Sequence, residues 1–338
     1  MPPHTPSLLG FGSALVDVLA DVDEGFLRSV PGDKGGTQLV SPDDMDALLR
    51  RLPNPPVTLP GGAARNTLAA FARLGGRAAM LAVTGDDPRG HLYRQSLRHD
   101  GVSDAHCRLA APGHPTGTVL SLITPDAERT MRTNLGANLD VDTDTFRPID
   151  FQGFSHFLLE GYAFRQQGIA ADLARKAHDA GLTVCLDCNA PEVVTAYHDE
   201  LREVLTHHVS LVFANELEAA AFAGSDRPTD ALRAFLECCD LAAVKLGRHG
   251  CLLQRRGDAT HLHIPAFAVE TPRDTTGAGD FWAAGFLASL LAGHSLAEAG
   301  RFGARVAAEV VQVVGTALPA PVWQRLRDEL NPTPTHQP

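Results

Sequence analysis

The residues best suited to chemistry lie in the segment Asp274-Thr-Thr-Gly-Ala-Gly-Asp280, which an apolar run from Phe281 to Ala292 follows at once. This is the pattern of a small-residue turn that opens a buried helix. At such a start the backbone N–H groups of Gly277, Ala278 and Gly279 lack helical partners, and the helix dipole adds partial positive charge. Because glycine has no Cβ, a phosphate can approach this backbone closely. The segment therefore predicts a turn that holds phosphate oxygens.

Asp280 stands beside this turn, where its carboxylate would repel the phosphate that the amides attract. That cost indicates a task for the carboxylate. An aspartate there can accept the proton of an attacking hydroxyl while the amides stabilise charge on the transferring phosphoryl group. The alternative is that Asp280 only caps the helix, as aspartate commonly does. The segment alone does not separate these two interpretations.

A second glycine-rich region lies nearer the start of the chain. Gly61-Gly62-Ala-Ala-Arg-Asn66 precedes a helical stretch that ends at Leu74, and Gly85-Asp-Asp-Pro-Arg-Gly90 follows a strand. Two separated glycine turns predict two ligands. Together with the later segment, they resemble both signatures of the ribokinase-like carbohydrate kinase family, the pfkB group that also contains adenosine kinases. Those signatures are GG-x-x-x-N with a later GDD-x-x-G, and DTTGAGD-x-x-x-A-G.

The resemblance runs from about Leu8 to Pro319 and implies a fold and a reaction. The fold would be α/β, a Rossmann-like three-layer sandwich with a small β-sheet lid. ATP and Mg²⁺ would be co-substrates, Asp280 the base, and Gly277 to Gly279 the anion hole.

The resemblance also implies which residues bind the substrate. An early aspartate, together with the glycines and the asparagine of the first signature, matches Asp17, Gly61, Gly62 and Asn66. A carboxylate and an amide together can fix the orientation of a diol. Without the resemblance, a turn role for Asp17 and a helix-start role for Asn66 would be favoured. Further candidates are Glu160 at a strand end and, in an expected lid strand, Arg132 and Arg129.

Two segments resemble the family's nucleotide site. Asn215-Glu-Leu-Glu218 follows an apolar strand and looks like the N-x-x-E motif. The motif implies magnesium and phosphate handling, with Glu218 acting directly or through water. Outside the family, such a pattern is more often a helix start with a solvated glutamate. Val244-Lys-Leu-Gly-Arg-His-Gly250 resembles V-T-x-G-x-x-G, which implies nucleotide contacts from Gly247 and Gly250.

Lys245 stands where the family commonly has threonine, and it could supply charge to a phosphate. Thr275 of the C-terminal motif is expected at the nucleotide as well. The positions of a monovalent-cation site in many members match Asp274, Thr276 and Gly315, which adds K⁺ as an expected ion.

The elements that position these residues follow from alternating apolar runs. Strands are expected at Leu8–Phe11, Ala78–Thr84, Phe154–Leu159, Leu182–Leu186, Leu211–Phe213 and Ala242–Leu246. Helices are expected at Ala64–Leu74, Pro88–Arg98, Gln166–Ala180 and Glu216–Ala223. This alternation predicts βαβ crossovers and a mostly parallel sheet covered on both faces.

Polar and apolar residues alternate around Thr116–Ile123 and again at Arg129–Thr133, which favours antiparallel strands, and Val16–Val22 and Thr37–Val40 are expected to join them. We expect them to form a small sheet that serves as a lid; the alternative is an edge extension of the main sheet. One domain is expected over residues 1–330, with lid strands from about 13–40 and 105–138. The Pro-rich tail, residues 331–338, is expected to be disordered.

Composition restricts the partners and the compartment. The formal net charge of −11 argues against nucleic acid and membrane partners. No apolar run is long enough to cross a bilayer, and the start does not resemble a secretory signal. Six cysteines without a disulfide spacing favour a reducing cytoplasm. Cys185 and Cys188 have C-x-x-C spacing, but we expect core residues rather than a zinc site.

The sequence therefore predicts an ATP-dependent kinase acting on a hydroxyl, the primary CH₂OH, of a small sugar. The alternative substrate is adenosine or another ribonucleoside, and a third reading is a sugar or nucleotide sensor without catalysis. Sugar is favoured because the expected lid strands are polar and aromatic residues are only 6% of the chain. A homodimer could form through apolar lid residues, namely Val119, Leu120 and Leu122.

Overall fold

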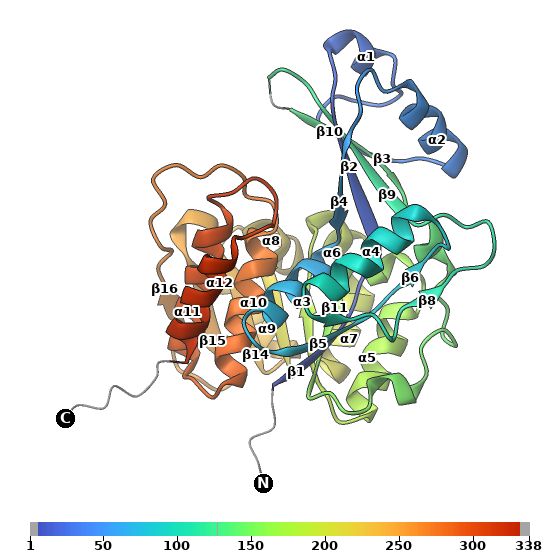
Figure 1. The fold of residues 1–338 in the computed structure, drawn as a ribbon. Helices are drawn as coiled ribbons and strands as arrows, with labels where there is room; N and C mark the ends of the chain where they lie inside the picture. The colour runs from blue at the N-terminus through green and yellow to red at the C-terminus, as the bar shows by residue number, and fades with distance from the viewer. Residues whose placement is uncertain (1–5, 127, 332–338) are drawn as a thin grey trace.

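The computed structural model describes residues 6–126 and 128–331. Its largest element is a central sheet of nine strands, against which most of the helices pack (Figure 1). In spatial order its strands are β16 (Leu262–Ile264), β15 (Cys251–Arg255), β14 (Leu241–Lys245), β13 (Leu211–Asn215), β12 (Thr183–Asp187), β11 (His156–Glu160), β1 (Ser7–Phe11), β5 (Arg77–Leu81) and β7 (Val102–Ser103). The strands from β14 to β7 pair in parallel, and β15 and β16 extend the sheet by antiparallel pairing.

Helices cover both faces of this sheet. The first face carries α3 (Ala63–Arg73), α4 (Pro88–His99), α10 (Ala278–Leu291), α11 (Leu296–Val310) and α12 (Ala320–Leu330). The second carries α5 (Ile169–Asp179), α6 (Pro191–Ala196), α7 (His198–His208), α8 (Glu216–Ala223) and α9 (Pro228–Cys238). The predicted three-layer α/β sandwich is confirmed. None of these helices, in the part of the chain that the structure describes, has the length and apolar character needed to span a membrane.

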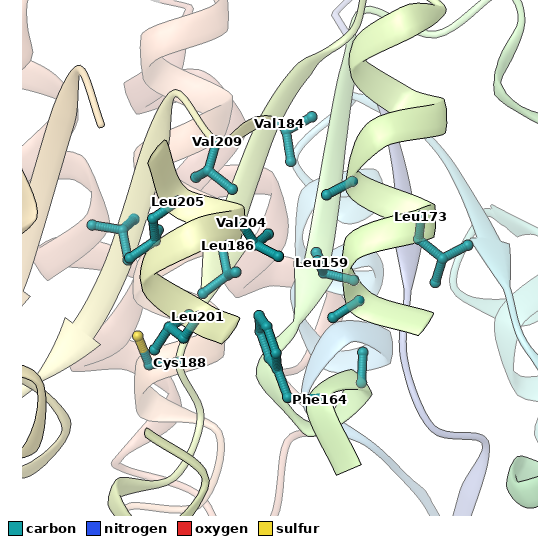
Figure 2. Packing of buried hydrophobic residues seen from close by; sticks show 14 of the residues in the cluster. Leu159, Phe164, Leu173, Val184, Leu186, Cys188, Leu201, Val204, Leu205 and Val209 are labelled. Carbon is teal, nitrogen blue, oxygen red and sulfur yellow. The ribbon is translucent and has the colours of Figure 1, made fainter. Parts of the chain in front are cut away.

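Each inner strand is apolar along its middle because its side chains alternate between two buried faces. Figure 2 shows the core on the second face, where Leu159 and Leu186 of the sheet meet Leu173, Leu201 and Val204 of the helices. Cys188 belongs to this core, whereas Cys185 is buried in the core on the first face. All six cysteines are free and buried, so the expectation of core residues is confirmed.

A smaller five-stranded sheet stands apart from the main one, at the carboxyl ends of its parallel strands (Figure 1). Its order is β3 (Thr37–Leu39), β10 (Arg129–Asn134), β9 (Gly117–Ile123), β2 (Leu15–Asp21) and β4 (Val57–Gly61). An edge extension of the main sheet is therefore excluded. The expected antiparallel pairing of β9 with β10 is confirmed, whereas β2 and β9 both run outward from the main body and so pair in parallel. Strand β4 was not expected from the sequence.

Two helices, α1 (Glu24–Arg28) and α2 (Pro42–Arg51), cover one face of the smaller sheet. Leu120 and Leu122 lie fully buried beneath them. The expectation that these two leucines form an exposed dimer surface is therefore wrong. Exposed apolar side chains occur instead on the edge strands, with Leu39 on β3 and Val57 on β4.

The remaining elements are short. The expected strand Ala78–Thr84 divides, because the chain leaves the main sheet after β5 and forms β6 (Val83–Thr84), which pairs with β8 (Arg108–Leu109). Single 3₁₀ turns occupy Gly136–Asp140, Pro148–Phe151, Gly161–Arg165 and Gly247–His249. The predicted disordered tail lies, beyond Asn331, outside the described residues.

Helix α10 is fixed by close packing against α11. A Cβ on Gly285 of α10 would lie 2.7 Å from Val306 Cγ2, and a Cβ on Gly303 of α11 would lie 2.8 Å from the carbonyl oxygen of Trp282. Both distances are shorter than a carbon side chain tolerates, so glycine at these positions lets the helices touch. This contact holds the start of α10 at one place above the sheet.

Candidate active site

Polar side chains end four neighbouring parallel strands. Glu160, Asp187, Asn215 and Lys245 are the last residues of β11, β12, β13 and β14. Glu160 lies opposite Asp187 in the strand register, and Asn215 lies opposite Lys245. Because parallel strands share one carboxyl edge, these groups gather where open α/β sheets bind ligands.

The start of α10 lies at the same edge. Its N-cap is Gly277, whose left-handed φ of 74° suits glycine, and no side chain caps the helix. Asp280 lies three residues inside, so the helix-cap interpretation of Asp280 is wrong. The amide of Ala278 donates to the carbonyl of Thr275 at 3.1 Å, which removes it from the predicted anion hole. Within the described residues the amides of Gly277, Gly279 and Asp280 have no such acceptor.

Asn66 of α3 meets Asp280 across the site. Its Nδ2 donates to Asp280 Oδ2 at 3.0 Å, while its Oδ1 is buried with no partner among the described residues. Burial raises the pKa of Asp280 to about 8, and the charge of Asp187 acts in the same direction. The hydrogen bond from Asn66 and the charge of Lys245 oppose the rise in the pKa. The structure thus joins the two glycine-rich motifs at one carboxylate.

A cleft of about 620 Å³ opens beside this pair, between the smaller sheet and the helices of the first face. Asp17 of β2, Gly61 of β4 and Asn66 line it, as does Arg129. Burial raises the pKa of Asp17 to about 6, whereas the charge of Arg129 lowers it. Gly61 is required because a Cβ would overlap the Asp17 carboxylate. These predicted substrate residues therefore share one wall of the cleft.

Gly62 shapes the entry to α3. It is the N-cap of that helix with φ 100°, and a Cβ would lie 2.7 Å from the carbonyl oxygen of Ser13. Glu160 lies just behind, buried, and its carboxylate accepts the amides of Ser13 at 3.2 Å and Ala64 at 3.0 Å. Glu160 thus fixes the loop around the cleft and does not line the cleft, contrary to the expected substrate contact.

Arg132 is not part of the site. Its guanidinium is buried within the smaller sheet, where it donates to the backbone carbonyls of Pro31, Gly36 and Met131. Arg129 reaches the cleft instead: its guanidinium lies 3.4 Å from Thr276 Oγ1 and 3.6 Å from Asp274. The expectation for Arg132 is wrong because the position of a residue along a strand does not reveal which face its side chain takes.

Asn215 and Glu218 form a reciprocal cap at the start of α8. Asn215 Oδ1 accepts the amide of Glu218 at 2.9 Å, and Glu218 Oε2 accepts the amide of Asn215 at 2.8 Å. The motif is therefore a helix start, but Glu218 is buried rather than solvated. Burial, followed by the charge of Asp187, raises the pKa of Glu218 to about 7.

The expected nucleotide turn lies next to these residues. Gly247 and Gly250 both take left-handed φ values, of 52° and 89°, and a Cβ on Gly250 would overlap the backbone at Ile264. Thr275 is exposed at the start of the α10 turn. Lys245 Nζ lies 3.1 Å from Asp187 Oδ2.

Asp274 holds the two sides of the predicted cation site together. Its Oδ1 accepts the amide of Thr276 at 2.9 Å and the hydroxyl at 2.7 Å, and its Oδ2 accepts the amide of Gly315 at 2.9 Å. These contacts fix the turn before α10. Activation by K⁺ stays a prediction.

Sequence reasoning missed Asp187 and Asn189. Asn189 takes a left-handed φ of 62°, unusual for a residue other than glycine, and its Oδ1 accepts the amide of Gly161 at 2.7 Å. The available signal was a polar residue directly after the apolar strand Leu182–Leu186, the same signal that singled out Asn215.

Comparisons with known proteins point to one family. The model of the pfkB family of carbohydrate kinases matches residues 52–323. The aminoimidazole riboside kinase of Salmonella typhimurium is 32% identical over 68% of this chain and 73% of its own length. The fructokinase of Klebsiella pneumoniae is 31% identical over 69% of this chain and 77% of its own. The crystal structure of adenosine kinase from Sinorhizobium meliloti superposes with a TM-score of 0.83, at 32% identity, over 96% of this chain and 99% of that one.

The difference in the free energy of unfolding between Asp280→Asn and wild type is expected to shift in favour of the variant as pH rises. The folded protein keeps a proton on Asp280 up to about pH 8, whereas the unfolded chain loses it near 3.8. Between these values the folded state binds more protons, so wild-type stability falls with rising pH. Asparagine has no such proton.

Chemical denaturation at about pH 5 and about pH 9 measures this difference in the free energy of unfolding. The exposed Asp43→Asn on α2 is the control. A difference between Asp280→Asn and wild type that does not change with pH would refute the raised pKa.

Proposed function

This chain belongs to the pfkB family of carbohydrate kinases, and from that premise we propose that it transfers the γ-phosphoryl group of ATP to the primary hydroxyl of a small sugar. It is a kinase of the sugar and nucleoside type, with ATP as phosphate donor. One observation supports the proposed chemistry above the others: the Asp280 carboxylate lies beside unpaired amides at the start of α10, held by Asn66.

In the proposed reaction Asp280 accepts the proton of the acceptor hydroxyl. The hydroxyl oxygen forms a bond to the γ-phosphorus while the bond between that phosphorus and the β,γ-bridging oxygen breaks, and ADP leaves. The amides of Gly277, Gly279 and Asp280 stabilise the charge that develops on the transferring group. Because Asp280 must be a carboxylate to act, its raised pKa places the working range toward neutral and alkaline pH.

The acceptor would lie in the cleft against Asp17 and Asn66. Asp17 can accept two hydroxyl protons, and the unpartnered Asn66 Oδ1 can accept a third. Gly61 lets the Asp17 carboxylate pack against the backbone of β4, and Gly62 lets the Ser13 loop approach the start of α3. Hydrogen-bond acceptors on Asp17 and Asn66, close to Asp280, favour a small polyhydroxylated acceptor.

The nucleotide would bind on the other side of Asp280, near Gly247, Gly250 and Thr275. Mg²⁺ would accompany ATP and neutralise its phosphates, and the buried carboxylate of Glu218, acting directly or through water, suits the oxygen preference of that ion. Asn215 would serve by holding Glu218 in place. The six free cysteines fit a reducing compartment, and we place the enzyme in the cytoplasm on that ground.

The smaller sheet would act as a lid over the cleft. Arg129 already extends from β10 of that sheet to Asp274 and Thr276 before α10. Closure would exclude water, which otherwise competes with the acceptor hydroxyl for the phosphoryl group.

A nucleoside is the second candidate acceptor. The adenosine kinase of Sinorhizobium meliloti matches nearly the whole chain at 32% identity, and the Salmonella relative is named for a riboside. Ribosides and sugars present the same primary hydroxyl and diol to Asp17 and Asn66. A riboside therefore differs from free ribose in the base attached to the ring.

A panel assay decides between the two acceptors. ADP release would be measured with ribose, fructose, related sugars, aminoimidazole riboside and adenosine. Higher kcat/KM with a free sugar supports the first proposal, and higher kcat/KM with a riboside or nucleoside supports the second. Ligand binding without ADP release above the ATPase background would refute both and favour a sensor.

Asp280→Asn is expected to lower kcat by about 10²- to 10⁴-fold while acceptor and nucleotide affinities stay close to wild type, since only proton acceptance is lost. Single-turnover kinetics and equilibrium binding measure the two quantities separately. Wild-type turnover in the purified variant would show that another group is the base.

We also propose a homodimer through the smaller sheet, because Leu39 and Val57 lie exposed on its two edge strands. Sedimentation at micromolar concentration is expected to give a dimer, and the double variant Leu39→Asp, Val57→Asp a monomer. Leu262→Asp, at an exposed residue of β16, is the control. A wild-type monomer at that concentration would contradict the proposal.

A further inference from the structure

The carboxyl edge of the main sheet holds a buried ion pair. Lys245, one of three lysines in the chain, lies at the end of β14, and its Nζ is 3.1 Å and 3.4 Å from the two carboxylate oxygens of Asp187. The two side chains are only 13% and 7% exposed. Strand β13 lies between β12 and β14, so the pair bridges two strands that do not touch each other.

The ammonium of Lys245 also lies against the first turn of α10. A Cβ on Gly279 would be 3.2 Å from Lys245 Nζ. The amide of Gly279 is one of those without an acceptor in the described residues. An ammonium has three donors, and within the same residues Asp187 is its single acceptor. Lys245 can therefore reach an anion bound at this turn.

The surroundings keep Lys245 charged. Burial acts to lower the pKa of Lys245, but the negative charges of Asp187, Glu218 and Asp280 outweigh burial and raise it. The acidic side chains around Lys245 therefore hold its ammonium in the charged form. The arrival of a polyanion at the turn would change that balance most strongly at Lys245.

We propose that Lys245 is the protein's cation for the β- and γ-phosphates of the nucleotide, and that Asp187 is a positioning residue that holds its ammonium at the start of α10 until a nucleotide binds. This inference rests on the proposed kinase function and names the residue that neutralises charge in its phosphoryl transfer. Lys245 gives up no proton. The acceptor proton goes to Asp280, and the ammonium donates hydrogen bonds to phosphate oxygens as the bridging P–O bond breaks.

The competing explanation is a purely structural ion pair that ties β12 to β14. The two explanations predict different behaviour for the two partners. A structural pair makes Lys245 and Asp187 equivalent, since removing either one breaks it. If Lys245 binds phosphate, the two substitutions have opposite effects on phosphate affinity, because Lys245 attracts phosphate and Asp187 repels it.

Calorimetric binding of ADP in excess EDTA tests the pair without a metal ion and without turnover. Lys245→Met is expected to weaken ADP binding about 10- to 100-fold, the usual loss for a charged hydrogen bond. Lys245→Arg keeps the charge and is expected to lose less affinity. Asp187→Asn is expected to bind ADP as tightly as wild type or more tightly.

Lys176→Met is the matched control. Lys176 of α5 is a buried lysine paired with Asp172 at 2.6 Å, with side chains 9% and 13% exposed, and it does not line the cleft. Removing it is expected to lower stability and leave ADP affinity unchanged. Equal losses of ADP affinity in the control and in Lys245→Met would overturn the inference.

The pH dependence of kcat/KM gives a second readout. The pKa of Asp280 depends on Asn66, Glu160, Asp187 and Lys245. The variants change Asp187 and Lys245 and leave the other two in place. Because Lys245 lowers the pKa of Asp280 and Asp187 raises it, the acid limb is expected to move to higher pH in Lys245→Met and to lower pH in Asp187→Asn.

The outcomes separate this inference from the proposed function. The inference would be overturned if Lys245→Met bound ADP as tightly as wild type, if Lys245→Met and Asp187→Asn lost equal stability, and if the acid limb of the kcat/KM profile did not move. Those results would make the ion pair structural. ADP release that no acceptor stimulates in the wild type would count against the kinase proposal, whereas the ADP affinities judge Lys245 independently.

Discussion

One constraint underlies the site: a half-buried carboxylate, Asp280, lies beside backbone amides that attract negative charge. The position of Asp280 is fixed by the fold. Asp280 belongs to the first turn of α10, and α10 packs closely against α11 at Gly285 and Gly303. Desolvation raises the pKa of this carboxyl group to about 8, so it binds a proton more tightly than an exposed aspartate does. A group in that condition readily accepts a proton from a substrate.

The sheet gives the site its remaining charges. Parallel strands end at one edge, which collects Glu160, Asp187 and Lys245 from separate parts of the chain. Glu160 is committed to two backbone amides, whereas Asp187 and Lys245 remain close to the turn before α10. Several acidic side chains and one ammonium meet at this edge, an arrangement that suits a ligand accompanied by metal ions.

The cleft is built between two rigid parts. Asp17 and Gly61 come from the smaller sheet, Asn66 from α3, and the anion turn from α10. Arg129 reaches across from the smaller sheet to the segment before α10, 3.4 Å from Thr276 and 3.6 Å from Asp274. A site assembled in this way can open by moving one sheet, while Asp280, Asn66 and the turn keep their geometry.

The sequence by itself determined the local features: the glycine turns, the helix starts and the apolar strands, because positive φ angles, free amides and burial on two faces depend on nearby residues. It therefore predicted the glycine turn at Gly277 and the helices that contain Asp280 and Asn66. Tertiary structure alone decided the directions and the partners. It turned Arg132 into the smaller sheet, buried Leu120, and brought Asp187 to Lys245 across 58 positions of the chain, because only strand pairing fixes which distant side chains share an edge.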